Sequence, residues 1–230
     1  MSAAMLTRVV VGVDFGVASG EAVAAAGALA AATGASLTVV HVETLDVPPY
    51  FTGAQMAALE AERAAARHVA EDYVRTFARA HTKTPADVQV VEGSPVDALL
   101  DAAHGADLLV VGTDSRRGLR RWWLGSVAEA VVRAAHVPVL VVRATPESDA
   151  NAAAGAPGGA GLFADPGVRV LAAEPVGTSA ARWLAILRAV CRARVSTLTG
   201  LSACSREALA ASDLLVVSNR SDAVGPEAAE

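Results

Sequence analysis

Hydrophobic residues occur in this chain as short continuous runs rather than in strict alternation with polar residues. The first run, 8–13, is rich in valine and ends at Asp14, Phe15 and Gly16. That arrangement is typical of a strand buried on both faces and followed by a turn. Similar runs recur along the first part of the chain, and the pattern predicts strands at 8–13, 37–42, 88–91, 108–111 and 139–142.

Helical signals fill the segments between these strands. Ser19 is expected to cap a helix over 21–32, and Gly34 follows the end of that helix. Ser94 and Pro95 have the residue types favoured at the N-cap and first position of a helix, which should end near 103. A further helix is expected over 127–135.

The longest predicted helix runs from about 52 to 80. Its charged residues are interpreted as a face in contact with solvent. The opposite face is expected to be an apolar stripe at helical spacing, made of Leu59, Ala66, Val69, Tyr73 and Phe77.

Strands that alternate with helices indicate βαβ crossovers and hence a parallel sheet covered on both faces. We therefore predict a doubly wound, five-stranded α/β domain over residues 1–144. Hydrophobic residues make up 53% of the chain and aromatic ones only 4%, so its core must be mainly aliphatic.

The composition changes to Ala, Gly, Pro, Ser and Asn after the first domain, which predicts a flexible linker over 145–167. The segment 168–221 then resembles a shortened first domain. Residues 169–173 parallel 8–12, and 195–201 parallel the second strand. The clearest repeat is that of 105–112 by 211–218.

Such self-similarity is typical of duplication, and we interpret 168–221 as a degenerate half-domain. It has no counterpart of the long helix, the third strand, the glycine loop or the last strand. The alternative is that α/β sequences simply resemble one another. Residues 222–230 are expected to form a disordered tail.

Composition and charge narrow the function classes. The net charge of −5 argues against a general nucleic-acid binder. Two cysteines, Cys191 and Cys204, make no disulfide framework, and the histidines lack the spacing of metal ligands. The N-terminus lacks a signal-peptide pattern, and the longest apolar run, 22–32, is too short to span a bilayer. We expect a cytoplasmic protein without nucleic-acid or membrane partners.

A Gly- and Arg-rich loop joins the predicted strand 108–111 to the helix over 127–135. Its glycines allow backbone N–H groups to turn inward, and Ser126 is expected to cap the helix, whose N-terminus carries partial positive charge. This order of parts predicts an anion site. The loop also holds a basic and aromatic cluster, for which single-stranded nucleic acid, packing and a subunit contact are alternatives: Arg116, Arg117, Arg120, Arg121, Trp122 and Trp123.

Together these features resemble the universal stress protein family over 8–143. The resemblance implies the strand order 3-2-1-4-5, which brings the first and fourth strands together at the reversal of strand order, where ligands bind in such sheets. It rests on Val11-Gly12-Val13-Asp14 with Gly16 and Ser19, on 37–42, on Glu92-Gly93-Ser94-Pro95, on 107–112, on Gly118, on 125–129 and on 137–143.

Members of this family that bind ATP carry the pattern Gly-x2-Gly-x9-Gly-Ser/Thr. Gly112 matches its first glycine and Gly125-Ser126 its last pair, but Ser115 replaces the middle glycine. If that position needs a left-handed backbone, serine costs about 1–2 kcal/mol there. Asp114 also opposes a phosphate, by up to about 4 kcal/mol at about 4 Å and an effective dielectric constant of 20.

The resemblance implies that Asp14 faces the ribose or a phosphate-bound magnesium ion, although Asp14 is also suited to bonding its own loop. It implies that Val42 contacts the base through its backbone. Gly125 and Ser126 would hold phosphates. The remaining expected nucleotide-binding residues are Gly16, Gly112, Ser115, Arg116 and Val127.

These expectations leave two functions open. The first is a regulatory, stress-response protein that binds ATP, lacks robust catalysis and associates with an unknown signalling partner according to its nucleotide state. The second is an interaction module that has lost nucleotide binding. Slow ATP hydrolysis, with Asp14 as the base, is a third. The family forms dimers through its last strand, so a homodimer through the edge strand from Val139 to Val142 is expected, unless the half-domain covers that edge.

Overall fold

The computed structural model describes residues 6–44, 53–113, 125–143, 169–174, 194–199 and 214–217. Its helices are α1 (Val17–Thr33), α2 (Gly53–His81), α3 (Pro95–Ala102) and α4 (Ser126–Ala134). Its strands are β1 (Arg8–Val13), β2 (Ser36–Glu43), β3 (Ala86–Glu92), β4 (Leu108–Thr113), β5 (Val139–Arg143), β6 (Arg169–Glu174), β7 (Arg194–Thr199) and β8 (Leu214–Val217).

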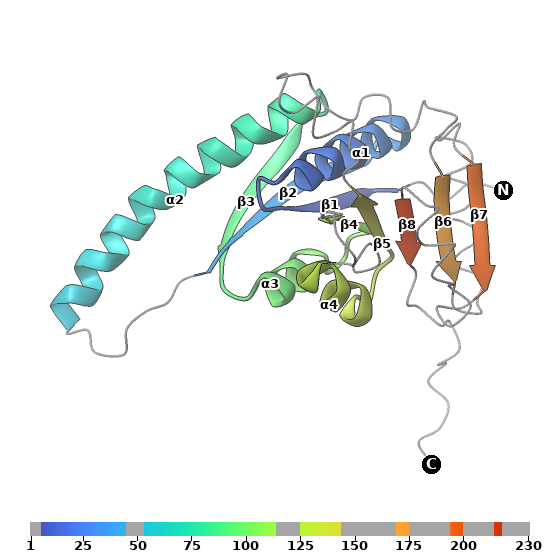
Figure 1. The fold of residues 1–230 in the computed structure, drawn as a ribbon. Coiled ribbons are helices and arrows are strands. Elements are labelled where there is room, and N and C mark those ends of the chain that lie inside the picture. Colours follow the sequence, from blue (N-terminus) through green and yellow to red (C-terminus); the bar gives the residue numbers. More distant parts are fainter. Residues whose placement is uncertain are drawn as a thin grey trace, which may run out of the picture.

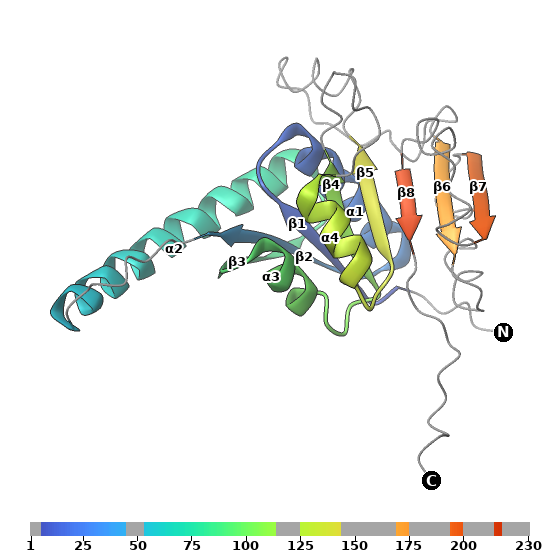
Figure 2. The same cartoon turned by 60° about the horizontal axis from the view of Figure 1, so that its bottom comes forward.

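The first five strands form a parallel sheet in the order β3-β2-β1-β4-β5. Helices α1 and α2 cover one face of this sheet, and α3 and α4 cover the other (Figures 1 and 2). This arrangement confirms the predicted doubly wound α/β domain and its strand order. The ends of the five predicted strands lie within two residues of the observed ends.

The core consists of two apolar layers, one on each face of the sheet. Val9 and Val11 of β1 pack in the layer under α1, whereas Val10 packs in the layer under α3 and α4. All three side chains are completely buried. Burial of a valine or leucine side chain contributes about 1.5–3 kcal/mol, so valine runs without alternation are stabilised only where both faces are covered.

The first helix begins earlier than the sequence suggested. Gly16 is its N-cap, with an extended backbone, and Ser19 lies inside the first turn with its side chain buried. The prediction of Ser19 as the cap was therefore wrong, because its hydroxyl bonds to Asp14 instead. The end of α1 was predicted correctly: Gly34 adopts φ 76°, and its N–H donates to the carbonyl of Ala30.

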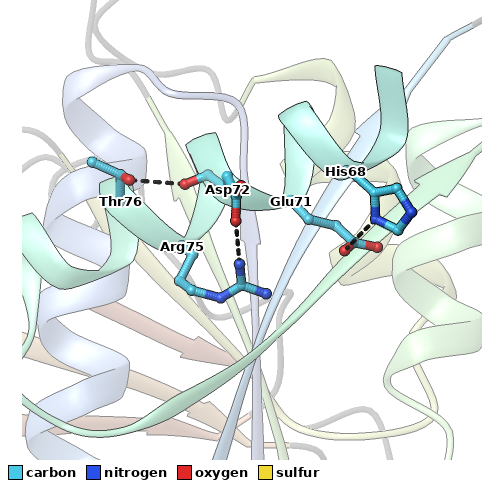
Figure 3. Close-up of polar contacts among 5 residues, drawn as sticks. All are labelled: His68, Glu71, Asp72, Arg75 and Thr76. Carbon is cyan, nitrogen blue, oxygen red and sulfur yellow. Dashed lines mark hydrogen bonds and ion pairs between the residues drawn. The ribbon is translucent and has the colours of Figure 1, made fainter. Parts of the chain in front are cut away.

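Helix α2 turns a different face to the core than expected. Val69 and Tyr73 of the predicted stripe are 71% and 59% exposed, whereas Val74 and Ala78 are buried. The many alanines of this helix made its phase ambiguous, and the observed face is rotated from the predicted one by about one residue. Part of the predicted solvent face is confirmed: Arg75 pairs with Asp72 at the surface (Figure 3). Arg63 differs, because its Nε is buried.

Three further strands extend the sheet beyond β5. The order continues β5-β8-β6-β7, with β8 antiparallel to β5 and with β6 parallel to both β8 and β7 (Figure 1). β5 is therefore not an edge strand in this chain. The proposed linker 145–167 and tail 222–230 lie outside the described residues, as do Cys191 and Cys204, and the interpretation of 168–221 as a degenerate half-domain stays a prediction.

Candidate functional site

The turn between β1 and α1 is closed by the side chain of Asp14. Its Oδ1 accepts the backbone N–H of Gly16 at 3.0 Å and also accepts the hydroxyl of Ser19. The same hydroxyl oxygen accepts the backbone N–H of Asp14 at 2.9 Å. Asp14 is nevertheless exposed, and its carboxylate contacts with other described residues are made by Oδ1. The turn-forming role is thus observed.

An aromatic cluster holds the residue after Asp14 in an unusual backbone conformation. Phe15 has φ 64°, the left-handed region that side chains other than glycine rarely adopt. Its ring lies 4.4 Å from that of His41 and 4.7 Å from that of Tyr73, centroid to centroid. His41 is itself fixed, because its Nδ1 donates to the carbonyl of Val13 at 2.9 Å. The sequence analysis assigned Phe15 no role, although a bulky aromatic residue within a turn was the available signal.

At the end of β4, Gly112 allows two backbones to approach closely. A Cβ atom on this residue would lie 2.6 Å from the carbonyl carbon and oxygen of Ala18 and 2.9 Å from the nitrogen of Ser19. Glycine is therefore required here because α1 begins directly against β4. This contact links the expected nucleotide-binding Gly112 to the turn that carries Asp14.

Thr113 joins the two ends of the glycine loop, a role that the sequence analysis missed. Its buried hydroxyl accepts the backbone N–H of Gly125 at 3.0 Å, so the strand end and the helix start are held together. Among β-branched strand residues a threonine gives little sign of such a role. Ser115 and Arg116, as well as Asp114 and the basic and aromatic cluster, lie outside the described residues.

The start of α4 differs from the prediction by one residue. Gly125 is the N-cap, with φ −56° and ψ 153°, and Ser126 is the first helical residue rather than the cap. No described side chain caps this helix, and the first-turn N–H groups of Ser126 and Val127 have no partners within the helix. Gly125 and Ser126 are exposed, and Val127 is half-buried.

Val42 lies where its backbone extends past the neighbouring strand. The pairing of β1 with β2 ends at Val13 and His41, whereas β2 continues to Glu43 and pairs with β3 there. On the side of β1, the backbone of Val42 therefore lies beyond the ladder. This placement fits the expected contact of its backbone with a base.

These residues meet at one edge of the sheet. β1 and β4 are neighbours in which Gly12 pairs with Val111, so the residues that follow both strands leave the sheet side by side. A continuous series of contacts runs from Asp14 to Ser19, Gly112, Thr113 and Gly125. We call this set the carboxyl-edge site.

The described part of the chain holds no group of three or more His, Cys, Asp or Glu side chains suited to a metal ion. None of its helices combines the length and the hydropathy that a bilayer crossing requires.

Comparison with known protein sequences shows which family this chain is similar to. A model described as the universal stress protein family matches residues 5–143. A universal stress protein of Thermus aquaticus is 39% identical over 132 residues, which cover 54% of this chain and 88% of that protein. One of Mycobacterium tuberculosis is 36% identical over 140 residues, which cover 59% of this chain and 45% of that protein.

A universal stress protein of Methanocaldococcus jannaschii is 47% identical over 57 residues, covering 24% of this chain and 34% of that protein. The chain thus spans less than half the length of the mycobacterial and methanococcal relatives that it matches. Among solved structures, a universal stress protein in complex with cAMP is 31% identical, with a TM-score of 0.41, and the match covers 60% of this chain and 98% of that one.

The family match contains β1 to β5 together with every residue of the carboxyl-edge site, and it extends over more than half of the chain. The strand order β3-β2-β1-β4-β5 is the one that the resemblance to this family implies. This chain belongs to the universal stress protein family.

Proposed function

We propose that this protein binds an adenine nucleotide, with ATP as the expected species, at the carboxyl-edge site, and that the bound nucleotide controls its association with a partner protein. One observation carries the proposal. The contacts from Asp14 through Ser19, Gly112 and Thr113 to Gly125 join an exposed carboxylate to a helix N-terminus that has no side-chain cap.

The phosphate end of the site has the donors that a phosphate needs. The N–H groups of Ser126 and Val127 point out of the first turn of α4, where the helix dipole favours negative charge by about 0.3–1 kcal/mol. Among the described residues, a Cβ on Gly125 would meet nothing closer than the Thr113 hydroxyl at 3.7 Å, so these residues leave space beside the N–H groups. Hydrogen bonds to charged groups contribute about 1.5–3 kcal/mol each, so micromolar binding, about −8 kcal/mol, requires several of them.

The residues at the nucleoside end of the site come from β1 and β2. The second carboxylate oxygen of Asp14, Oδ2, is suited to accept a ribose hydroxyl, and the backbone of Val42 beyond the β1–β2 ladder is suited to the edge of a base. Magnesium, if it accompanies the triphosphate, would use the Asp14 carboxylate together with phosphate oxygens and water, which is the usual arrangement for this ion.

Association rather than catalysis is the proposed output. Asp14 is the residue considered as a base, and its Oδ1 is already committed to Gly16 and Ser19. If Oδ2 accepts a ribose hydroxyl as proposed, neither carboxylate oxygen is left to accept a proton from an attacking water. We therefore propose a cytoplasmic regulatory protein in which ATP turnover is slow or absent.

Isothermal titration of the full chain with ATP and magnesium tests this proposal. We expect heat consistent with one site per chain, weaker binding of AMP because the α4 N–H groups lose their phosphate partners, and weaker binding of GTP at the base contact. Absence of heat at millimolar ATP would contradict nucleotide binding. It would favour the interaction module, for which Ser115 and Asp114 are the sequence evidence.

A further inference from the structure

Three strands of the C-terminal segment pair in the same pattern as three strands of the first domain. β6 lies between β8 and β7 and is parallel to both, as β1 lies between β4 and β2. The order β7-β6-β8 thus repeats the order β2-β1-β4. A shared strand order alone is common in α/β proteins, so the register is the sharper comparison.

The registers also coincide, residue for residue. The sequence repeat makes Val170 the counterpart of Val9, and it makes Leu214 the counterpart of Leu108. In the sheet Val9 pairs with Leu108, and Val170 pairs with Leu214. The four pairs of β1 with β4 correspond in this way to the four pairs of β6 with β8.

The register of β6 with β7 likewise matches that of β1 with β2. Val9 pairs with Leu37 in β2, and Val170 pairs with Val195, the first residue of the segment that parallels the second strand. A slip of one residue would exchange the two faces of a strand, so two matching registers are a strict condition. Sequence similarity and backbone pairing therefore indicate the same correspondence.

Among the described residues of the C-terminal segment, no strand corresponds to β5, and β8 pairs with the β5 of the first domain. Val139 pairs with Val217 and Val142 pairs with Leu214, in antiparallel register. β5 thus lies between β4 on one side and β8 on the other. The side chains of Val139, Leu140, Val141 and Val142 are at most 1% exposed.

The opposite end of the sheet shows what a free edge looks like in this protein. β3 is an edge strand, and Asp87 and Gln89 on it are exposed. Polar residues of this kind protect an edge from pairing with another chain. β5 has no such residue before Arg143, so an uncovered β5 would be a ready template for a second strand.

We propose that residues 168–221 are a truncated second copy of the first domain and that its β8 closes the β5 edge from within the same chain. The second copy therefore takes the position that a second chain would occupy in the expected homodimer through β5. This inference does not rest on nucleotide binding, and it predicts that the intact protein does not associate through β5.

Cross-linking tests the pairing in the full chain, in a Cys191→Ser, Cys204→Ser background. The matched pair is Val141→Cys with Leu215→Cys, because these residues are direct partners. Direct partners have Cα atoms about 4.5–5.5 Å apart, within the range of a disulfide. The control is Val141→Cys with Val217→Cys, a diagonal pair about 7–8 Å apart.

On oxidation we expect an intrachain disulfide in the matched variant at the monomer mass of 23.2 kDa, formed at least tenfold faster than in the diagonal control. Equal rates in the two variants would overturn the proposed register. A disulfide-linked dimer as the main product of the matched variant would overturn the closure of β5 by its own chain.

Oligomeric state supplies the second test. Analytical ultracentrifugation of the unmodified chain should give a monomer of 23.2 kDa. Val216→Pro in β8 should release β5 and produce a dimer, whereas Thr197→Pro in the outermost strand β7 should remain monomeric. A Val216→Pro monomer whose β5 amides stay protected from hydrogen exchange would refute the proposal. If this variant loses its far-UV circular dichroism signal, the cross-linking experiment decides the question.

Discussion

The hydroxyl of Ser19 donates to the carboxylate of Asp14 and accepts the backbone N–H of the same residue. One small side chain therefore fixes both the backbone and the side chain of the exposed aspartate. The contact also explains why Ser19 is buried inside the first turn of α1 instead of capping it. The orientation of the Asp14 side chain depends on this pair.

Replacement of Ser19 by alanine should weaken nucleotide binding together with stability. It leaves the Asp14 N–H without its partner, and an unsatisfied group of this kind costs about 1–3 kcal/mol. We expect a lower melting temperature and a several-fold higher Kd for ATP. Ser36→Ala is the matched control, because its hydroxyl bonds to Thr7 at the opposite end of the sheet. An unchanged Kd for ATP in Ser19→Ala would show that the contact between Ser19 and Asp14 does not contribute to nucleotide binding.

Two glycines of the carboxyl-edge site should respond differently to alanine. Gly112→Ala forces a methyl group against the backbone of Ala18 at 2.6 Å, and the resulting shift of α1 should cost at least about 1–3 kcal/mol. Gly125→Ala meets only ordinary contact at 3.7 Å, so chemical denaturation should show a loss below about 1 kcal/mol.

Nucleotide titration gives a further test of Gly125→Ala. The methyl group of Gly125→Ala occupies the space beside the α4 N–H groups, so we expect a clear loss of ATP affinity in a well-folded protein. If this variant retains full ATP affinity, the phosphate does not bind at the start of α4.

The hydroxyl of Thr113 should be required at the end of β4. Thr113→Val keeps the shape of the side chain but leaves the N–H of Gly125 without its acceptor, at a cost of about 1–3 kcal/mol. Thr113→Ser retains the hydroxyl and should recover most of the nucleotide affinity that the valine variant loses. If valine and serine bind ATP equally well, the closure of the loop ends does not contribute to the site.

Replacement of Ser115 by glycine should increase ATP affinity by about tenfold. The expectation follows from the family pattern, in which this position is glycine, and from the cost of about 1–2 kcal/mol for a left-handed serine. Ser36→Gly serves as a control, because Ser36 begins β2 at the opposite end of the sheet and its replacement should leave ATP affinity unchanged. Equal affinities of the wild type and Ser115→Gly would refute the backbone argument.

The extent of successful sequence prediction follows from the physics of each element. The run from Val9 to Val13 predicted β1 well, because burial on two faces leaves an unmistakable apolar pattern. Gly34 predicted the end of α1, since its left-handed backbone is a local requirement. These features depend on neighbours in the sequence.

The misplaced features depend on particular hydrogen bonds and backbone conformations that the apolar pattern of the sequence does not record. Ser19 and Ser126 are both good capping residues, and whether either caps a helix is decided by the bond to Asp14 in one case and by the position of Gly125 in the other. Thr113 was missed for the same reason, because its partner lies across the whole glycine loop. The antiparallel pairing of β5 with β8 likewise has no local signal.

The change of direction between β5 and β8 has a consequence for the two rims of the sheet. Strands β6, β7 and β8 all point opposite to β1 to β5, as Figure 1 shows, so their final residues emerge on the far rim. A strand of about five or six residues is about 17–20 Å long, so the two rims lie about that far apart. The two rims of this one sheet are therefore chemically separate. Substitutions around the final residues of β6 and β8 should leave the chemistry at Asp14 unchanged.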